Sequence, residues 1–330
     1  MEFLFADWLG TPAWFWLAFL GLVVALTAFD LGVLHKEDKA MGIGESLKLT
    51  AFYVTIALLF GAWVWAEKGA DLGMKYYTGF FIEKALSIDN VFVISLIFTF
   101  FAIPPKYQYR ALLWGIVAVI FLRGAMIAGG AALVEQAYWV LYIFAAFLVF
   151  TGIKMFFAND HDPDIGNNPA VRWISRHMRV TKELHDQHFF VKVPDEKTGK
   201  MVNAATPLFL ALVVINLADL VFAVDSVPAI FAITTDTFIV YTSNIMAILG
   251  LRALYFALAA MIDRFAYLKY ALAAVLVFIG SKIFGDKFPP VLSLGVTFAL
   301  IAGGVAYSLW KTRGQPLHDP AEPIASGTIN

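Results

Sequence analysis

The sequence contains no cysteine, few charged residues and almost no net charge. Without cysteine, the chain can form no disulfide, thiolate metal site, haem attachment or catalytic thiol. Charged residues make up 15% of the chain, whereas a typical soluble domain has about 25%. An ordinary cytosolic enzyme is therefore excluded, and the net charge of −1 gives no indication of a nucleic-acid partner.

Several sequence motifs are also missing. The nucleotide-binding pattern Gly-x-x-x-x-Gly-Lys-Ser/Thr is absent, and so are the serine-hydrolase pattern Gly-x-Ser-x-Gly and the intramembrane-protease pattern Gly-x-Gly-Asp. We therefore expect neither an ATP-driven pump nor an intramembrane enzyme, and we expect no bound cofactor.

What the sequence has in excess is apolar residues, which make up 60% of the chain and include 31 Phe. A bilayer core takes about 20 apolar residues per helix. On that basis the sequence predicts an all-α polytopic membrane protein with about nine transmembrane helices. The predicted spans are 13–34, 48–66, 77–103, 111–133, 138–157, 207–233, 238–262, 265–283 and 289–310.

The distribution of Lys and Arg predicts the orientation. On one side of the predicted spans the only basic residues are Lys68, Lys75, Lys282 and Lys287. Nearly all others fall in the alternate loops and the C-terminal tail, which the positive-inside rule places in the cytoplasm. Because the N-terminus lacks the basic start of a signal peptide, we expect the first span to be retained. The prediction is a multi-pass protein of the inner (plasma) membrane, N-terminus outside and C-terminus inside.

One sizeable polar segment interrupts the predicted transmembrane domain, 1–310. This cytoplasmic loop, 158–206, contains a stretch at 173–185 that fits a short amphipathic helix. Two short β-rich stretches beyond it flank a turn at 195–199 and predict a small hairpin. The loop is also the candidate surface for protein partners. The tail, 311–330, is rich in Pro, Ala, Gly and Ser and is expected to be disordered.

Two predicted spans carry acidic residues at the same spacing. An acid in the middle of a span costs about 2.5–3.5 kcal/mol, so such residues are functional candidates. In each span an acid is followed six positions later by Asp, then by a small polar residue and Val. These residues are Glu83, Asp89 and Asn90 in the third span, and Asp219, Asp225 and Ser226 in the sixth.

The spans that follow these two also match each other. The stretch from Gly115 to Arg123 aligns with the stretch from Asn244 to Arg252. Because the copies begin three spans apart, they cross the membrane in opposite directions. The sequence therefore predicts a 3+3 inverted-topology repeat, spans three to five (about 77–157) and six to eight (about 207–283), as in many secondary transporters.

The repeated positions form an all-oxygen ligand set, which suits Mn²⁺, Mg²⁺ or Ca²⁺. The expected ligands are Glu83, Asp89, Asn90, Asp219, Asp225, Ser226 and Asn244, with Lys84, Arg123 and Arg252 balancing charge. Alternatively, the acids pair with these bases and only hold helices together. Pairing alone leaves one of the four acids without a base and does not explain the repeated spacing.

Three further expectations concern single positions and the coupling. Pro228, three residues after Asp225, frees a backbone carbonyl and predicts local unwinding of the sixth helix. Asp30 lies near the end of the first span and is expected to be solvated. Because a carboxyl group away from water favours its protonated form and a bound cation favours the charged form, the acids could exchange protons for metal.

Stretches 83–93, 218–229 and 242–256 resemble the TerC/Alx family of integral membrane proteins, and the resemblance covers nearly the whole chain. It implies manganese export, metal supply to exported proteins and a link to tellurium resistance. Tellurite itself is an anion, which buried carboxylates would repel. The alternative function is an accessory membrane protein that scaffolds other membrane or secreted proteins without carrying ions.

Overall fold

The computed structural model describes residues 2–33, 42–157, 172–173, 179–181, 183–194, 201–258, 265, 267–284 and 289–313. The protein is mostly helical in these ranges. The main helices are α2 (Ala13–Val33), α3 (Ile43–Lys68), α4 (Ala70–Phe100), α5 (Pro105–Gln136), α6 (Val140–Phe157), α8 (Pro207–Phe231), α9 (Thr237–Leu249), α10 (Leu251–Leu258), α11 (Leu268–Phe284) and α12 (Pro290–Lys311). A short α1 (Glu2–Phe5) and the strand pairs β1 (Asp7–Trp8) with β2 (Thr11–Pro12) and β3 (Phe190–Pro194) with β4 (Met201–Ala205) complete the fold.

Local sequence signals explain where several helices begin. Pro105 and Pro207 occupy the first turns of α5 and α8, where a missing N–H costs no helical hydrogen bond. The Thr206 side chain accepts a hydrogen bond from the Phe209 N–H at the start of α8. Asp236 does the same for the Ile239 N–H at the start of α9. These are the side-chain caps that isolated helix N-termini require.

Six helices in the described residues are long and apolar enough to cross a membrane, and the bent pair α9 and α10 makes a seventh. Helices also stand at the third and eighth predicted spans. However, α4 carries charged residues at its middle, and α11 has only 17 residues, so these two helices do not meet the same criteria.

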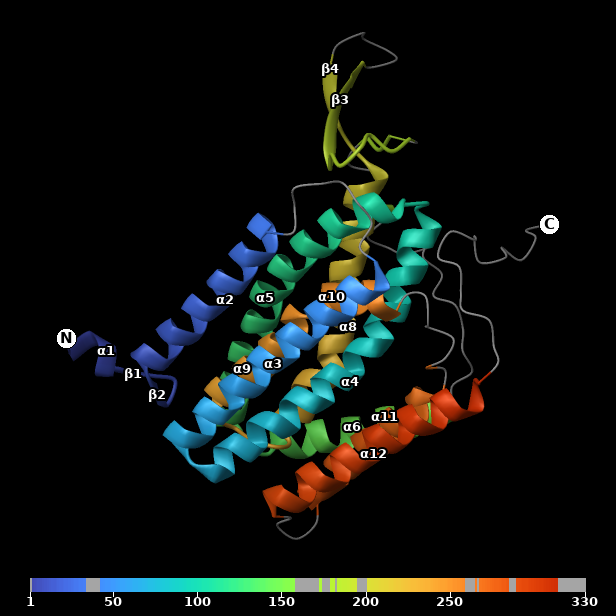
Figure 1. Ribbon diagram of the computed structural model, residues 1–330. Coiled ribbons are helices and arrows are strands. Elements are labelled where there is room, and N and C mark those ends of the chain that lie inside the picture. Colours follow the sequence, from blue (N-terminus) through green and yellow to red (C-terminus); the bar gives the residue numbers. More distant parts are fainter. Residues whose placement is uncertain are drawn as a thin grey trace.

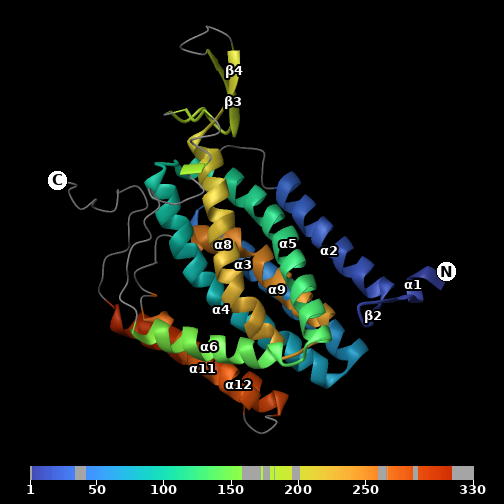
Figure 2. The ribbon, with the colours of Figure 1, turned by 180° about the vertical axis from the view of Figure 1, so that it is seen from behind.

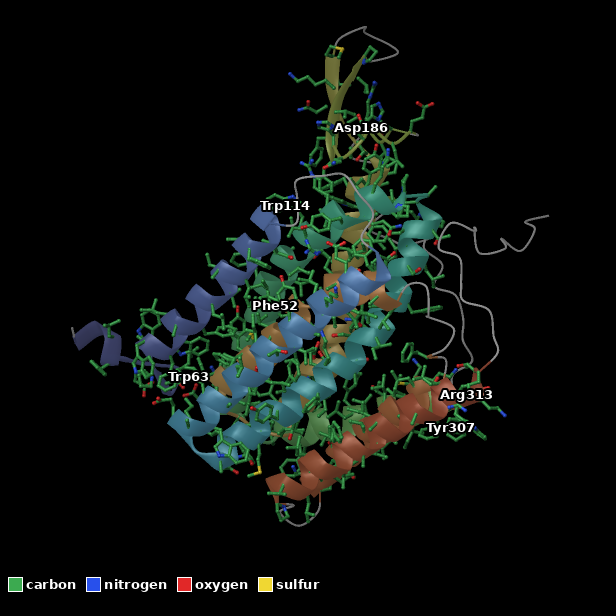
Figure 3. The ribbon with its side chains drawn as sticks, viewed as in Figure 1. Phe52, Trp63, Trp114, Asp186, Tyr307 and Arg313 are labelled. Carbon is green, nitrogen blue, oxygen red and sulfur yellow. The ribbon has the colours of Figure 1, made fainter. Side chains whose placement is uncertain are left out.

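Trp63 and Trp114 lie near opposite ends of the bundle (Figure 3), as in an interfacial aromatic belt. Nine spans and the orientation stay predictions.

The helices form two layers (Figures 1 and 2). Helices α2 to α5 and α8 to α10 make the main bundle, and α6, α11 and α12 form a second layer against it. Helix α4 packs on α9, α5 packs on α8, and α6 packs on α11. The first predicted repeat contains α4, α5 and α6, and the second contains α8, α9 and α11. If each helix is exchanged for its counterpart, the α4–α9 contact becomes the α8–α5 contact, and the α6–α11 contact stays the same.

Glycines let α6 and α11 approach closely. A Cβ at Gly152 would lie 2.8 Å from the Ala273 carbonyl oxygen, and one at Gly280 would lie 2.7 Å from the Ala145 carbonyl oxygen. The sequences around them, 150–155 and 278–283, read Phe-Thr-Gly-Ile-Lys-Met and Phe-Ile-Gly-Ser-Lys-Ile. The third members of the two predicted repeats therefore also resemble each other in sequence.

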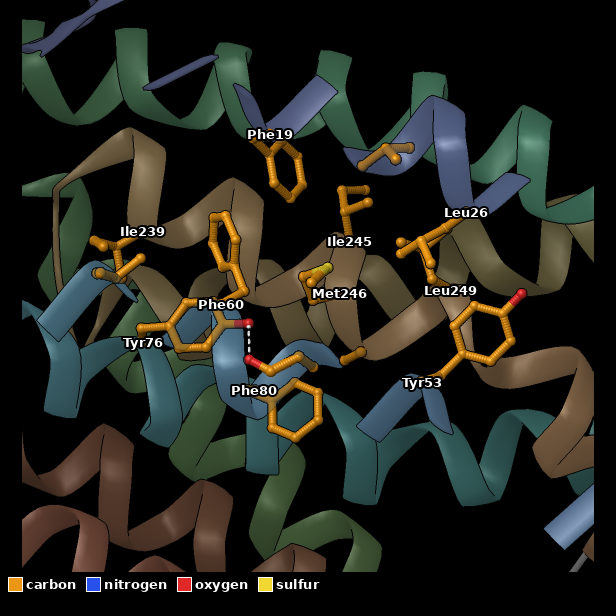
Figure 4. Close-up of a cluster of buried hydrophobic side chains, with 14 of the residues drawn as sticks. Phe19, Leu26, Tyr53, Phe60, Tyr76, Phe80, Ile239, Ile245, Met246 and Leu249 are labelled. Atoms are coloured by element: carbon orange, nitrogen blue, oxygen red, sulfur yellow. Dashed lines mark hydrogen bonds between the residues drawn. The ribbon is translucent and has the colours of Figure 1, made fainter. Parts of the chain in front are cut away.

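An aromatic cluster joins α2 to α3, α4 and α9 (Figure 4). Phe19, Phe60 and Tyr76 are buried together between α2, α3, α4 and α9. The Phe60 and Tyr76 ring centroids are 5.6 Å apart, and the Tyr76 hydroxyl donates to the Ala57 carbonyl at 3.0 Å. A buried tyrosine needs such a partner, so this bond fixes the contact between α3 and α4.

The predicted hairpin is present, with Phe190 opposite Ala205 in an antiparallel pair. It lies at the end of the bundle where α4 ends and α5 and α8 begin (Figure 1). The Tyr107 hydroxyl on α5 donates to Asp186 at 2.9 Å, so the hairpin's base is attached to the bundle. In the stretch predicted as an amphipathic helix, 173–185, residues 179–181 and 183–185 are not helical, and Val180 forms a bridge to Ala205. Residues 174–178 and 182, the turn at 195–200 and the tail beyond 313 lie outside the described residues.

The predicted unwinding at Pro228 is wrong. Helix α8 continues through Asp225 and Pro228 to Phe231. A proline near a helix end removes only one backbone hydrogen bond, so the last turn tolerates it. The break occurs instead in the predicted seventh span, where α9 ends before Gly250 and α10 starts after it at a bend of 41°.

Candidate functional site

Arg123, on α5, is the centre of the buried polar site and is only 1% exposed. Its Nε and Nη2 donate to the two carboxylate oxygens of Asp219 on α8, at 2.9 and 2.8 Å. Its Nη1 donates to Glu83 on α4. The planar guanidinium matches a carboxylate bidentately, as few other side chains can, and here it joins three helices.

Three neutral polar side chains complete the site. Asn244 on α9 accepts from Arg123 Nη1 at 3.0 Å and donates to Glu83 Oε2 at 3.0 Å. Ser226 accepts from Nη1 at 3.3 Å, and Asn90 donates to Asp219 Oδ1 at 3.4 Å. The structure thus brings together five predicted site residues around Arg123, and we call the set the Arg123 cluster. Its members are Glu83, Asn90, Arg123, Asp219, Ser226 and Asn244.

The Arg123 cluster has more negative than positive charge. Two carboxylates face one guanidinium, and Glu83, Asp219 and Arg123 are each at most 7% exposed. Leaving a buried charge uncompensated costs several kcal/mol. A proton or a cation bound here would remove this cost.

A cavity of about 250 Å³ lies beside the cluster. Glu83, Asn90, Arg123 and Ser226 line it together with Thr151, Lys154 and Asp225. Asp225 is partly exposed and accepts a long hydrogen bond, 3.5 Å, from the Thr151 hydroxyl on α6. Asp225 therefore belongs to the cavity wall. It lies six residues from Asp219, and thus about 240° around the helix axis, so it faces away from the carboxylate that Arg123 holds.

The acids are not arranged as a metal centre in this conformation. In the ranges that the structure describes, no group of three or more His, Cys, Asp or Glu side chains could hold a metal ion. Arg123 lies between Glu83 and Asp219, so these carboxylates converge on a guanidinium. Asp89 lies on α4, but its side chain is outside the described part of the structure.

The other two predicted charge-balancing residues point elsewhere. Lys84 Nζ donates to the Ala247 carbonyl at 3.0 Å, in the last turn of α9 before the break. Arg252 pairs with Asp30 on α2. The expectation that Asp30 is solvated is wrong, because it is 5% exposed. The sequence offered one indication of this pair: Asp30 lies within the first predicted span, and Arg252 lies in the middle of the seventh.

Comparison with known proteins assigns the family. The model of the integral membrane protein TerC family matches residues 68–316, which include both predicted repeats. An "Uncharacterized membrane protein" of Rickettsia bellii (strain RML369-C) is 48% identical over 89% of this chain and 96% of its own. The Myxococcus xanthus protein STKORF319 is 41% identical over 95% and 97%.

A named relative comes from Escherichia coli (strain K12). It is called "Putative membrane-bound redox modulator Alx" and is 43% identical over 91% of this chain and 95% of its own. No solved structure matches the chain significantly. By the family match and these relatives, the chain belongs to the TerC family of integral membrane proteins.

Proposed function

We propose that this protein is a secondary transporter, and not an enzyme, that exports a divalent cation, foremost Mn²⁺, in exchange for protons. The observation that carries the proposal is the Arg123 cluster. It places the oxygen-bearing side chains of Glu83, Asp219, Asn90, Ser226 and Asn244 around Arg123, with one net negative charge, buried beside a cavity of about 250 Å³. Oxygen ligands suit Mn²⁺, Mg²⁺ and Ca²⁺.

In this proposal Arg123 acts as an internal cation that the metal replaces. When the guanidinium withdraws, Glu83 and Asp219 become free to bind the metal together with Asn244, Ser226 and Asn90. Asp225 in the cavity wall, with Asp89 six residues after Glu83, supplies further carboxylate. Since these groups bind either protons or a cation, entry of protons could drive exit of the metal.

The pairing of the helices supports the inverted repeat. A two-fold axis in the membrane plane that exchanges α4 with α8 and α5 with α9 accounts for the α4–α9 and α5–α8 contacts. It also brings the third helices, α6 and α11, together at their equivalent glycines. Transporters with this architecture bind their substrate near the bilayer midplane between the repeats, which is where the Arg123 cluster lies in the predicted spans.

The test is Mn²⁺ flux into proteoliposomes that contain the purified protein, with a pH-sensitive dye in the lumen. Wild-type protein should carry Mn²⁺ and move protons in the opposite direction. Glu83→Gln and Asp219→Asn should abolish flux, whereas Asp7→Asn, at an exposed strand residue, should transport normally. Mn²⁺ flux without proton movement would refute the coupling and leave the cation site intact.

The second candidate is an accessory membrane protein. It is favoured by the β3–β4 hairpin, which stands at one end of the bundle as an accessible surface (Figure 1). A wild-type protein that is folded, correctly inserted and inactive in the flux assay would support this candidate and contradict transport. The name of the Escherichia coli relative, redox modulator, concerns that protein and is compatible with either function.

A further inference from the structure

Arg252 is buried, and only one of its three guanidinium nitrogens has a hydrogen-bond partner among the residues that the structure describes. It is 1% exposed, and its Nη2 donates to Asp30. Among the described residues, Nε and Nη1 have no hydrogen-bond partner. The Tyr109 ring lies 3.9 Å from the guanidinium carbon, which stabilises the cation but accepts no in-plane hydrogen bond. An unsatisfied buried donor is costly, so this arrangement needs an explanation.

Arg252 also lines a second, smaller cavity near the Arg123 cluster. This cavity of about 20 Å³ is lined by Asn90, Asp219 and Arg252 among apolar residues of α4, α5 and α8, and it has room for about one water molecule. The Asn90 Oδ1 has no hydrogen-bond partner among the described residues. The Asp219 carboxylate therefore borders both arginines, but only Arg123 bonds to it here.

The predicted repeat makes the two arginines equivalent. Arg123 uses Nε, Nη1 and Nη2 to hold Asp219 and Glu83. Arg252 has the same donor groups, but in the described part of the chain its Nε and Nη1 meet no acceptor. A bidentate grip uses Nη2 together with Nε or Nη1, as Arg123 shows with Asp219, so Arg252 can hold Asp219 in the same way once its Nη2 leaves Asp30.

The segment that carries Arg252 can move separately from the segment that carries Asn244. Helix α10 has eight residues and begins after the break at Gly250. Lys84 Nζ occupies the Ala247 carbonyl, which in an uninterrupted helix would accept from the residue 251 N–H. The Ala247 carbonyl therefore does not depend on α10 for a partner, and the Leu254 N–H donates instead to the carbonyl of Gly250 in the break, at 3.0 Å.

We propose that Asp219 exchanges between two arginines during transport: Arg123 holds it in the conformation described here, and Arg252 holds it in the alternate conformation. Asp30 is the counter-ion that retains Arg252 until the exchange. The inference rests on the proposed transport function and makes Arg252 and Asp30 positioning residues for it. The exchange keeps the number of buried charges constant, so neither conformation requires the burial of a new ion.

Cysteine labelling tests the exchange without requiring any transported ion. Because the chain has no cysteine, a single introduced thiol is the only target for a membrane-impermeant maleimide. Thr151→Cys reports on the larger cavity and Val119→Cys, a 4% exposed residue on the smaller cavity, reports on the other side of the cluster. In the otherwise unchanged protein we expect Thr151→Cys to react faster.

Removing the counter-ion should reverse this preference. Asp30→Asn frees Arg252 to bind Asp219, so labelling of Val119→Cys should increase and labelling of Thr151→Cys should decrease, each by about tenfold for a redistribution between two conformations. Adding Arg252→Gln to Asp30→Asn removes the freed arginine and should restore the original labelling pattern. A merely structural ion pair predicts no opposite change at the two cysteines with Asp30→Asn, because loosened packing would alter the labelling of both in the same direction.

Three outcomes overturn the inference: unchanged labelling with Asp30→Asn, parallel changes at both cysteines, or a double variant that labels like Asp30→Asn. If Asp30→Asn does not fold, Tyr53→Phe takes its place, since Tyr53 hydrogen-bonds Asp30 and its loss should shift labelling in the same direction by a smaller factor. An unchanged pattern there is equally contrary. If Asp30→Asn reverses the labelling but the wild-type protein carries no Mn²⁺, the proposal that Mn²⁺ is the transported ion is refuted. If the wild-type protein carries Mn²⁺ but Asp30→Asn leaves the labelling unchanged, only the arginine exchange is refuted.

Discussion

Replacing Gly280 by alanine should destabilise the crossing of α6 and α11. The added Cβ would lie 2.7 Å from the Ala145 carbonyl oxygen and 2.9 Å from a methyl group of Val149. Because the carbonyl oxygen belongs to the backbone of α6, it cannot move aside alone. The two helices must separate, and the side chains packed around the crossing lose contact.

The expected magnitude follows from two opposing terms. Overpacking a well-packed interface costs about 1–3 kcal/mol, whereas replacing glycine by alanine within a helix contributes about 1 kcal/mol in the opposite direction. Gly129→Ala on α5 is the matched control, because nothing lies within 4 Å of its added Cβ. Gly280→Ala should therefore be less stable than Gly129→Ala by about 1–3 kcal/mol.

Thermal unfolding of the purified variants in one detergent measures this difference. Gly152→Ala should behave like Gly280→Ala, because its Cβ would lie 2.8 Å from the Ala273 carbonyl oxygen at the same crossing. Once one alanine has separated the helices, the second should cost less, so the double variant should be more stable than additivity predicts. Equal stability of Gly280→Ala and Gly129→Ala would refute the close backbone contact. If the destabilisations of Gly152→Ala and Gly280→Ala simply add in the double variant, the idea that both act on the same helix crossing is wrong.

Three further outcomes are expected. Asp236→Ala removes the cap of α9 and the 3.3 Å ion pair with Lys68, so it should lower the free energy of unfolding by about 1–2 kcal/mol, while Asp71→Ala, an exposed carboxylate, should not. Tyr107→Phe removes the bond to Asp186 and should speed amide exchange in 183–194 with an unchanged unfolding temperature; protection equal to wild type would contradict this anchoring. Mn²⁺ at 100 times its dissociation constant should stabilise the wild-type protein by about 2.7 kcal/mol in thermal unfolding, and an equal gain in Glu83→Gln would place the metal elsewhere.

The sequence by itself determined that this is a helical membrane protein of the TerC family, where most helices lie, and that acids and bases inside the apolar spans form the set from which a central polar site is built. Charged side chains inside an apolar span are so costly that their presence marks them as a group. The repeated six-residue spacing therefore marked Glu83, Asp89, Asp219 and Asp225, with Arg123 and Arg252 in the spans that follow, as candidates without any coordinates. The hairpin was equally visible, because strand pairing across a short turn depends on local sequence.

Only the tertiary structure decided which charged groups are partners. Arg252 and Arg123 occupy equivalent places in the sequence, yet one pairs with Asp30 and the other with Glu83 and Asp219. Asp30 and Arg252 are 222 residues apart, and their contact depends on where α2, which lies outside the repeats, packs against the bundle. The break at Gly250 had the same origin, since the Ala247 carbonyl is satisfied by Lys84 of a different helix. Composition and spacing reveal the cost of burying a charge, but the choice of partner follows from packing between segments far apart in the chain.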